Sequence, residues 1–292
     1  MRHAILGAGG VGLAVGAALA EHGHEVVLVL RGSTPAEHPG AITVHSGLHG
    51  ERALPVTAVS LLREDVDVLW VTVKAPALTA ALGKVVPGAG TGAVVPLLNG
   101  LDHLDPLRHR FGDRVVAGSI RIEAERSAPG SVTWHAMSAT VELAGDDDAR
   151  LASVVDALRG TRIDCVVGPD PVTVLWRKLA MLLPLALATT AADGPLGVVR
   201  RTPETRELMR SAARELCAVA AAQAVSLRPE DSIAVLDALP GRTDTSLHRD
   251  VVAGVQPTEL AALTDPVLRL AAAHRVPTPS ITTLVKQIRR QR

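Results

Sequence analysis

The feature that most constrains this chain lies at its start. A short apolar run at His3–Leu6 leads directly into Gly7-Ala8-Gly9-Gly10-Val11-Gly12, a G-x-G-x-x-G pattern that opens a helical stretch at 11–22. In such a pattern the first glycine allows a tight turn, the second lets the backbone approach a pyrophosphate, and the third permits close helix–strand packing. The following helix N-terminus offers free N–H groups to the phosphates. We therefore expect a dinucleotide to bind at Gly7, Ala8, Gly9, Gly10, Val11 and Gly12.

Strand and helix patterns alternate through the first half of the chain. We expect strands at 3–6, 25–30, 68–73, 93–98 and 115–122, with helices at 11–22 and 77–86 between them. This alternation predicts a mostly parallel sheet with helices on both faces. Further strands are expected at 131–143 and 162–167, and the acidic run Asp146-Asp147-Asp148 is interpreted as a solvated turn.

The pattern changes after Gly168-Pro169-Asp170-Pro171. Helical segments are predicted at 171–192, 203–225, 230–238, 257–274 and 280–290, and no strand pattern occurs among them. A chain of 292 residues suits two domains, and glycine and proline mark the change of character near residue 168. The predicted fold class is α/β, with a Rossmann dinucleotide-binding domain at 1–168 and an all-helical domain at 169–292.

Composition narrows the class of function. Lys+Arg and Asp+Glu both number 30, so the formal net charge is zero and the basic excess of a duplex nucleic-acid binder is missing. The two cysteines, Cys165 and Cys217, lack C-x-x-C spacing and suggest neither a disulfide framework nor a metal site. We expect a cytoplasmic protein. Residues 1–20 lack the n-region, h-region and cleavage-site order of a signal peptide, and the apolar stretch 179–192 is only about 14 residues long, shorter than a membrane span.

Scarce residues are informative here. The chain has no tyrosine, which excludes a tyrosine general acid, and only four lysines stand against 26 arginines. Lysine is a compact charge whose pKa shifts readily, whereas arginine stays protonated. Lysines that remain, and the single asparagine Asn99, are therefore enriched for positions where a substitute fails. Lys74 and Asn99 each follow a predicted strand, and Lys178 lies early in the first helix of the second half.

The end of the second predicted strand indicates which cofactor is bound. NAD enzymes usually carry Asp or Glu there to bind the ribose 2′-hydroxyl. This chain has Val29-Leu30-Arg31-Gly32-Ser33, without a carboxylate. Arg31 would pair with a 2′-phosphate and Ser33 would add a hydrogen bond, so we predict NADP(H). The alternative is a solvated loop arginine.

Taken together, these motifs resemble the ketopantoate reductase (2-dehydropantoate 2-reductase) family of pantothenate biosynthesis. The resemblance rests on the glycine pattern, Val73-Lys74-Ala75, Asn99-Gly100 and Trp176-Arg177-Lys178. Later segments are also similar, namely Thr245-Ser246-Leu247-His248-Arg249-Asp250 with Pro257-Thr258-Glu259, and the 273–279 stretch. It implies an active site in the cleft between the two domains and a small-molecule substrate.

The resemblance also implies roles for single residues. Lys178 would be the general acid that protonates the alkoxide as hydride arrives from NADPH. Glu259 would hydrogen-bond the substrate hydroxyl, and Ser246 would bind the carboxylate or a nearby oxygen. Asn99 and Lys74 would position nicotinamide, ribose and substrate. Purely structural alternatives are a helix-dipole role for Glu259 and a helix cap at Ser246.

The chain also departs from the family pattern. The family has asparagines four and eight residues after the catalytic lysine, where this chain has Leu182 and Ala186, and Thr243 replaces a further asparagine. The Asp250-to-Glu259 spacing is one residue longer than usual. Because missing buried hydrogen bonds cost orders of magnitude in discrimination, a pocket lined by Leu182 and Ala186 would suit a more apolar substrate than ketopantoate.

Several functions therefore stay open from sequence. The first is reduction of ketopantoate itself, and the second is NADPH-dependent reduction of another carbonyl or an imine. A third is a non-catalytic NADP(H)-binding sensor, against which Lys178 argues. A β-hydroxyacid dehydrogenase is a fourth, although its G-x-x-G-x-G-x-x-x-K pattern is not found ahead of Lys178. The apolar C-terminal helices suit a homodimer interface or an intramolecular core.

Overall fold

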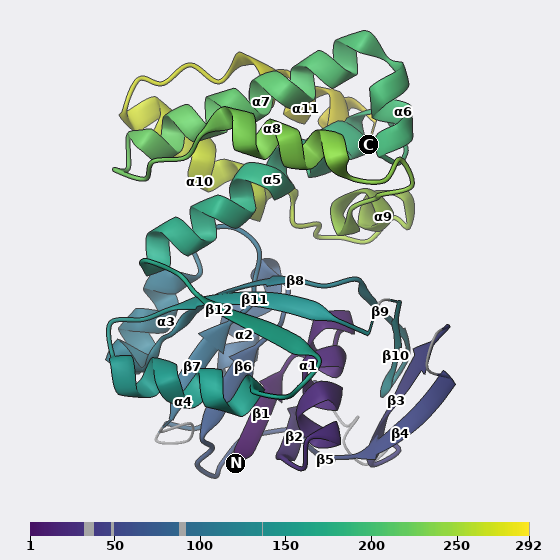
Figure 1. Cartoon of the computed structure of the whole chain (residues 1–292), viewed down its shortest axis with the longest axis vertical. Helices are drawn as coiled ribbons and strands as arrows, with labels where there is room; N and C mark the ends of the chain where they lie inside the picture. The colour runs from purple at the N-terminus through teal and green to yellow at the C-terminus, as the bar shows by residue number, and fades with distance from the viewer. Residues whose placement is uncertain (32–37, 48–49, 88–91, 136, 292) are drawn as a thin grey trace. The chain divides into compact units, whose positions relative to one another are not determined.

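The computed structural model of the chain describes residues 1–31, 38–47, 50–87, 92–135 and 137–291. The chain divides into two compact units. Unit 1 comprises Met1–Leu98 and His103–Val174, and unit 2 comprises Asn99–Asp102 and Leu175–Arg292. Figure 1 follows the chain through both. The segment Asn99–Asp102 therefore packs with the C-terminal half, although its neighbours on both sides belong to unit 1.

A five-stranded sheet forms the centre of unit 1. Its order is β5 (Thr57–Val59), β2 (Glu25–Val29), β1 (Arg2–Leu6), β6 (Val68–Val71) and β7 (Ala93–Pro96), and every pair is parallel. Strands β6 and β7 are buried throughout, as expected where a parallel sheet is covered on both faces. The parallel sheet predicted from alternating strands and helices is confirmed.

Helix α1 (Gly10–Glu21) lies between this sheet and a second one. The second sheet has the order β4 (Gly50–Pro55), β3 (Ala41–Ser46), β10 (Ser131–Trp134) and β9 (Ala124–Ala128). Figure 1 shows α1 with β1 and β2 on one side and β3, β9 and β10 on the other. Residues Gly12–Leu19 are all buried, because a helix covered on both sides needs apolar residues all round.

A third sheet corrects two sequence-based expectations. It has the order β12 (Ile163–Val167), β11 (Ala139–Ala144) and β8 (Ala117–Arg121). The strand predicted at 131–143 is two strands in different sheets, separated near Met137, which has a φ of +48°. The strand predicted at 115–122 forms β8, which pairs antiparallel with β11, and this stretch meets the parallel sheet through an isolated parallel bridge between Val115 and Val94.

The acidic run at 146–148 also has a more specific role than a solvated turn. It begins helix α4 (Asp148–Leu158), and the Asp147 carboxylate accepts a hydrogen bond from the backbone N–H of Arg150 at 2.9 Å. This N-cap satisfies one of the free donors of the first turn. The pKa of Asp147 is lowered, chiefly by that hydrogen bond. Other helical elements of unit 1 are α2 (Leu78–Leu82), α3 (Leu104–Phe111), η2 (Ala75–Ala77) and η3 (Gly112–Arg114).

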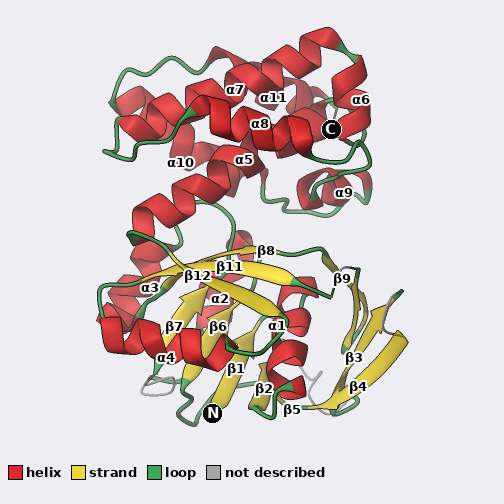
Figure 2. Cartoon of the chain, viewed as in Figure 1, coloured by secondary structure: helices red, strands yellow, loops and turns green. Residues whose placement is uncertain are grey.

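The described part of unit 2 is built of helices and connecting loops (Figure 2). The helices are α5 (Pro171–Ala191), α6 (Leu196–Arg201), α7 (Pro203–Ala221), α8 (Pro229–Ala238), α9 (Ser246–Val252), α10 (Leu260–Ala273) and α11 (Pro279–Arg290). Their apolar faces meet in a core that includes Trp176, Leu187, Leu216, Val267 and Leu284. Helix α10 begins three residues later than predicted, after the turn that contains Pro257.

Helix α5 is the one described helix that is long and apolar enough to cross a membrane by length and composition. Some 67% of its apolar window is buried inside the protein, which is also the character of a core helix.

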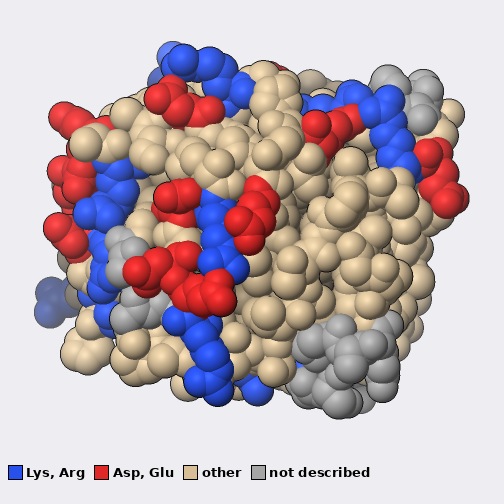
Figure 3. Space-filling model, turned by 90° about the horizontal axis from the view of Figure 1, so that it is seen from below, with Lys and Arg blue, Asp and Glu red and all other residues tan. Residues whose placement is uncertain are grey.

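Charges on the face shown in Figure 3 are of both signs and lie interspersed. This mixture agrees with the formal net charge of zero.

Candidate active site

The glycine turn after β1 has the geometry that a dinucleotide site requires. Gly7 has a φ of +115°, and a Cβ there would lie 2.7 Å from the backbone nitrogen of Val73. A Cβ on Gly12 would lie only 2.0 Å from the carbonyl oxygen of Gly7, so α1 can approach β1 only with glycine there. Gly9, in contrast, faces open space, because a Cβ placed there would have no other atom within 4 Å. The turn thus combines tight internal packing with a surface that is free to receive a ligand.

Thr72 holds this turn in place, and the sequence reasoning did not single it out. Its hydroxyl donates to the carbonyl oxygen of Gly7 at 2.7 Å, and its backbone N–H donates to the carbonyl of Leu6 at 2.9 Å. The signal that could have found it is a hydroxyl residue directly after a buried strand, beside the strand that carries the glycines. Thr72 therefore fixes the first turn from the neighbouring strand.

The two predicted cofactor cations of unit 1 are exposed and lie just beyond strand ends. Arg31 follows β2 by two residues, and Lys74 follows β6 by three and precedes η2. The carboxyl ends of β1, β2 and β6 lie at one edge of the sheet because the strands are parallel. This is the edge at which open α/β sheets bind their ligands. Ser33, the predicted companion of Arg31, lies outside the described residues.

Asn99 and Glu259, which are 160 positions apart in sequence, meet within unit 2. The Asn99 amide Nδ2 lies 3.4 Å from the Oε2 atom of Glu259, to which it donates. Glu259 is 4% exposed and directly precedes α10, yet its side chain makes no cap hydrogen bond to that helix. The carboxylate is therefore turned toward Asn99 rather than toward the helix terminus that the structural alternative assigned to it.

Lys178, Leu182 and Ala186 follow one another along α5 at spacings of four residues. The Lys178 side chain is half-buried, and so is that of Leu182, which packs against the helical core. Ala186 is 1% exposed and belongs to that core. The structure thus gives the two departures from the family pattern apolar surroundings, and contact of either with a substrate stays a prediction.

Ser246 is the first residue of α9, and the cap of this helix comes from its neighbour. The Thr245 hydroxyl accepts from the backbone N–H of His248 at 3.3 Å and lies 3.0 Å from the hydroxyl of Thr189 on α5. Because the Thr245 side chain caps α9, the cap role that sequence left open for Ser246 is not needed for this helix. The Thr189–Thr245 pair ties the start of α9 to the end of α5.

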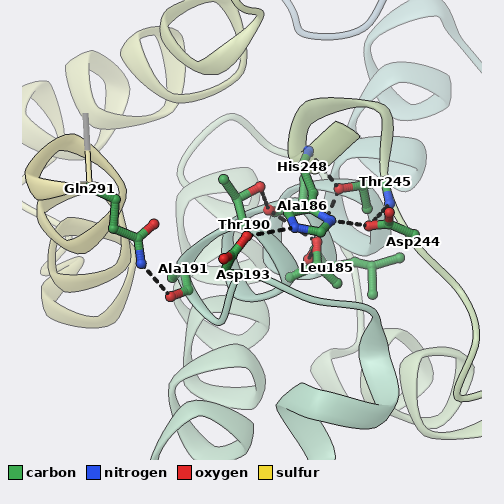
Figure 4. A network of polar contacts seen from close by, with 10 residues as sticks. Leu185, Ala186, Thr190, Ala191, Asp193, Asp244, Thr245, His248 and Gln291 are labelled. Atoms are coloured by element: carbon green, nitrogen blue, oxygen red, sulfur yellow. Dashed lines mark hydrogen bonds and ion pairs between the residues drawn. The ribbon is translucent and has the colours of Figure 1, made fainter. Parts of the chain in front are cut away.

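A buried histidine strengthens this junction, as Figure 4 shows. The His248 ring places Nδ1 2.7 Å from Oδ1 of Asp244 and Nε2 3.3 Å from Oδ1 of Asp193. A protonated ring can donate from both nitrogens at once. Thr190 adds a hydrogen bond from its hydroxyl to the carbonyl of Ala186 at 2.6 Å. Thr245 and His248, which flank Ser246, are therefore held by contacts with Thr189, Asp193 and Asp244.

Comparisons with known proteins agree with this arrangement. The model of the ketopantoate reductase PanE/ApbA family matches residues 3–145, and the model of its C-terminal part matches residues 172–292. The chain belongs to the ketopantoate reductase family. With this family it is an oxidoreductase that uses a nicotinamide dinucleotide, and its fold is that of the family.

Similar relatives span nearly the whole chain. A 2-dehydropantoate 2-reductase of Halobacterium salinarum is 29% identical over 99% of this chain and 98% of its own. Among solved structures, a 2-dehydropantoate 2-reductase from Geobacter metallireducens has a TM-score of 0.89 at 24% identity, with 100% of both chains covered. A D-mandelate dehydrogenase, solved with NADH and anilino(oxo)acetate, has a TM-score of 0.87 at 22% identity over 99% and 98% of the two chains.

No group of three or more His, Cys, Asp and Glu side chains that could hold a metal ion occurs in the part of the chain that the structure describes. The polar side chains discussed above instead contact one another in pairs, namely Asn99 with Glu259 and His248 with Asp244.

Proposed function

We propose that this protein reduces a 2-oxo acid to the 2-hydroxy acid with NADPH, in the manner of ketopantoate reduction to pantoate. The observation that carries the proposal is the Asn99–Glu259 pair, an amide and a buried carboxylate held together in the unit that also contains Lys178. Membership of the ketopantoate reductase family supports the same reaction type. On this view residues 1–168 bind the cofactor and residues 169–292 bind the substrate.

The residues of the first turn fit a dinucleotide. Gly9 faces open space at the start of α1, whose first N–H groups have no partner within the helix, so a pyrophosphate would find both room and donors there. Arg31, exposed beyond β2, would pair with the 2′-phosphate that distinguishes NADP from NAD. When bound, this cofactor supplies the hydride.

The residues of unit 2 would bind the oxo acid and deliver the proton. The Lys178 ammonium donates a proton from Nζ to the carbonyl oxygen as that oxygen becomes an alkoxide, which is general acid catalysis. Glu259 accepts a hydrogen bond from the hydroxyl that forms, and Asn99 keeps the Glu259 carboxylate in place. Ser246 donates its hydroxyl to the substrate carboxylate.

A second substrate class is favoured by the surroundings of α5. Leu182 and Ala186 offer no hydrogen bond where the family pattern has asparagines, so a 2-oxo acid with an apolar side chain would be preferred over ketopantoate, whose hydroxyl would be left unpaired. One extra apolar contact is worth about 10–200-fold in discrimination. The similar D-mandelate dehydrogenase, solved with NADH and anilino(oxo)acetate, supports a substrate class of this kind.

Steady-state turnover tests the proposal directly. Oxidation of NADPH is followed with ketopantoate, with branched-chain and aromatic 2-oxo acids, and with an imine. Turnover of at least one 2-oxo acid is expected, with the largest kcat/KM for an apolar one. Tight NADPH binding without turnover of any of them would favour the non-catalytic sensor instead.

Three variants assign the roles of Lys178 and Arg31. Lys178→Ala should lower kcat by about 10²–10⁴-fold, the range of general acid catalysis, while NADPH affinity stays unchanged. Lys178→Arg should be equally slow, because arginine keeps its proton. Arg31→Ala should weaken NADPH binding at least about tenfold, which is the loss of one charge-assisted phosphate contact, and leave NADH binding unaltered. Full activity of Lys178→Ala would remove the proposed acid.

A further inference from the structure

The segment Asn99–Asp102 is attached to the start of α10, to its length and to the helical core. Asn99 donates to Glu259 just before the helix, and Leu101 packs against the helical core. Gly100 has a φ of +91°, and a Cβ there would lie 2.6 Å from the carbonyl oxygen of Ala262 on the first turn of α10. Asp102 completes the series through an ion pair with Arg269 near the far end of the helix.

The Asp102–Arg269 pair is bidentate. The Arg269 Nη2 atom donates to Oδ1 of Asp102 at 2.7 Å, and Nη1 donates to Oδ2 at 3.2 Å. The exposed fraction is 59% for the Arg269 side chain and 56% for the Asp102 side chain, so the pair contributes little to burial. Its two parallel bonds instead restrict orientation, which a single charge–charge contact does not.

We propose that Asp102 and Arg269 are positioning residues that hold Asn99 against Glu259 for catalysis. This role rests on the function proposed above. The segment enters and leaves unit 2 within four residues, so its end away from Asn99 needs its own attachment to α10. With this attachment, Asn99 keeps its contact with Glu259 even when the flanking residues Leu98 and His103, which belong to unit 1, move.

The effect to expect is modest because the pair is exposed. Surface ion pairs are screened by salt, and only good geometry makes them significant. Arg269→Ala and Asp102→Ala should each lower kcat/KM for the oxo acid about three- to fivefold, with NADPH affinity and melting temperature unchanged. Raising the ionic strength from about 0.05 to 0.5 M should bring wild type toward the variants.

Rescue and coupling separate positioning from general destabilisation. The charge-swapped double variant Asp102→Arg/Arg269→Asp should recover most of the lost kcat/KM. In an Asn99→Ala background, Arg269→Ala should cause no further loss, because residues that act through one another are non-additive. The matched control is Arg214→Ala, which breaks a similarly exposed ion pair with Glu207 on α7 and should leave kcat/KM unaltered.

Independent losses in the Asn99→Ala background, or no recovery in the swapped variant, would overturn the proposal. Its failure can be told apart from failure of the proposed function. If wild type turns over no 2-oxo acid, amide hydrogen exchange at 100–102 still tests the attachment. Exchange several-fold faster in Arg269→Ala supports the attachment to α10, and equal exchange rates refute it.

Discussion

Two adjacent glycines of the first turn have different surroundings. A Cβ on Gly9 would meet nothing within 4 Å, whereas one on Gly10 would lie 2.3 Å from the backbone oxygen of Ala124 on β9. The motif pattern requires glycine at position 9 and leaves position 10 free, so only the structure shows why Gly10 matters. Neighbouring residues thus serve binding and packing separately.

Substitution by alanine should separate these two roles. Gly9→Ala should leave the melting temperature within about 1 °C and weaken NADPH binding at least about tenfold, because the new methyl group occupies the approach to the pyrophosphate. Gly10→Ala should instead destabilise unit 1 by about 1–3 kcal/mol, the usual cost of overpacking against backbone. Thermal unfolding and NADPH titration measure both; equal NADPH affinity in Gly9→Ala and wild type would place the cofactor elsewhere.

The sequence identified candidate site residues but did not show which of them lie in contact. The scarcity of lysine and asparagine pointed to Lys74, Asn99 and Lys178, but not to the contact between Asn99 and Glu259, which needs the chain to cross between units at 98–99. Sequence assigned Asn99 to the half that binds the cofactor. Contacts at such a distance depend on packing, which local patterns do not encode.

At the scale of elements, helix α11 depends on a cap from another helix. The Glu215 carboxylate on α7 accepts from the backbone N–H groups of Ser280 at 2.7 Å and Ile281 at 3.0 Å. The helix has no side-chain cap of its own at Thr278. Glu215 therefore satisfies two donors that the sequence around 278–281 leaves open, and joins α7 to α11.

Removing this cap should loosen unit 2. Glu215→Ala should lower the free energy of unfolding of unit 2 by about 1–3 kcal/mol, because the backbone N–H groups of Ser280 and Ile281 lose a charged acceptor. Glu215→Gln, which keeps one acceptor oxygen, should lose less. Urea unfolding monitored by helical circular dichroism measures the change, with the exposed Glu207→Gln on the same helix as control. Equal stability of Glu215→Ala and wild type would contradict the cap.

Strands and helices whose apolar residues recur at regular spacing could be predicted from the sequence, whereas mostly polar elements could not. The buried strands β1, β2, β6 and β7 and the long helices α5 and α7 stand close to their predicted positions. Strands β4 and β9 were missed because most of their residues are exposed and carry no alternation. Helix α4 was missed because the run before it suggested only a solvated turn.

At the scale of the whole molecule, the family pattern extends over nearly the whole chain, whereas the substrate preference that we propose depends on a few side chains. Residues 3–145 and 172–292 both match the family models, so both units carry the sequence pattern of the family. In our proposal, substrate choice depends on Leu182 and Ala186 of α5, which stand where the family pattern has asparagines. A fold of this kind can therefore be shared with reductases of different oxo acids.

The stability of the whole chain should depend on pH through a histidine in β1. His3 is fully buried, and its Nδ1 atom accepts from the indole N–H of Trp70 at 3.2 Å. Burial, assisted by the nearby charges of His24 and the N-terminus, lowers the pKa of His3 to about 3, from 6.5. The folded state therefore keeps this ring neutral where the unfolded chain takes up a proton.

This difference in proton binding sets the direction in which stability changes with pH. Between about pH 6.5 and 3 the unfolded state binds more protons, so the stability contributed by His3 is complete above pH 6.5 and is lost as the pH falls. The slope from one such group approaches about 1.4 kcal/mol per pH unit. His24, whose pKa is also lowered by burial, adds to the loss as the pH falls below 6.5.

Replacement of His3 should reduce this acid sensitivity. His3→Gln keeps an acceptor for Trp70 and cannot be protonated, so its free energy of unfolding should fall less steeply than that of wild type from pH 6.5 to 5. This window lies above the pKa range of ordinary carboxylates, so their protonation contributes little there. Denaturant titrations at several pH values measure the slopes, with the exposed His109→Gln as control. Parallel pH profiles for His3→Gln and wild type would show that His3 is not the group responsible.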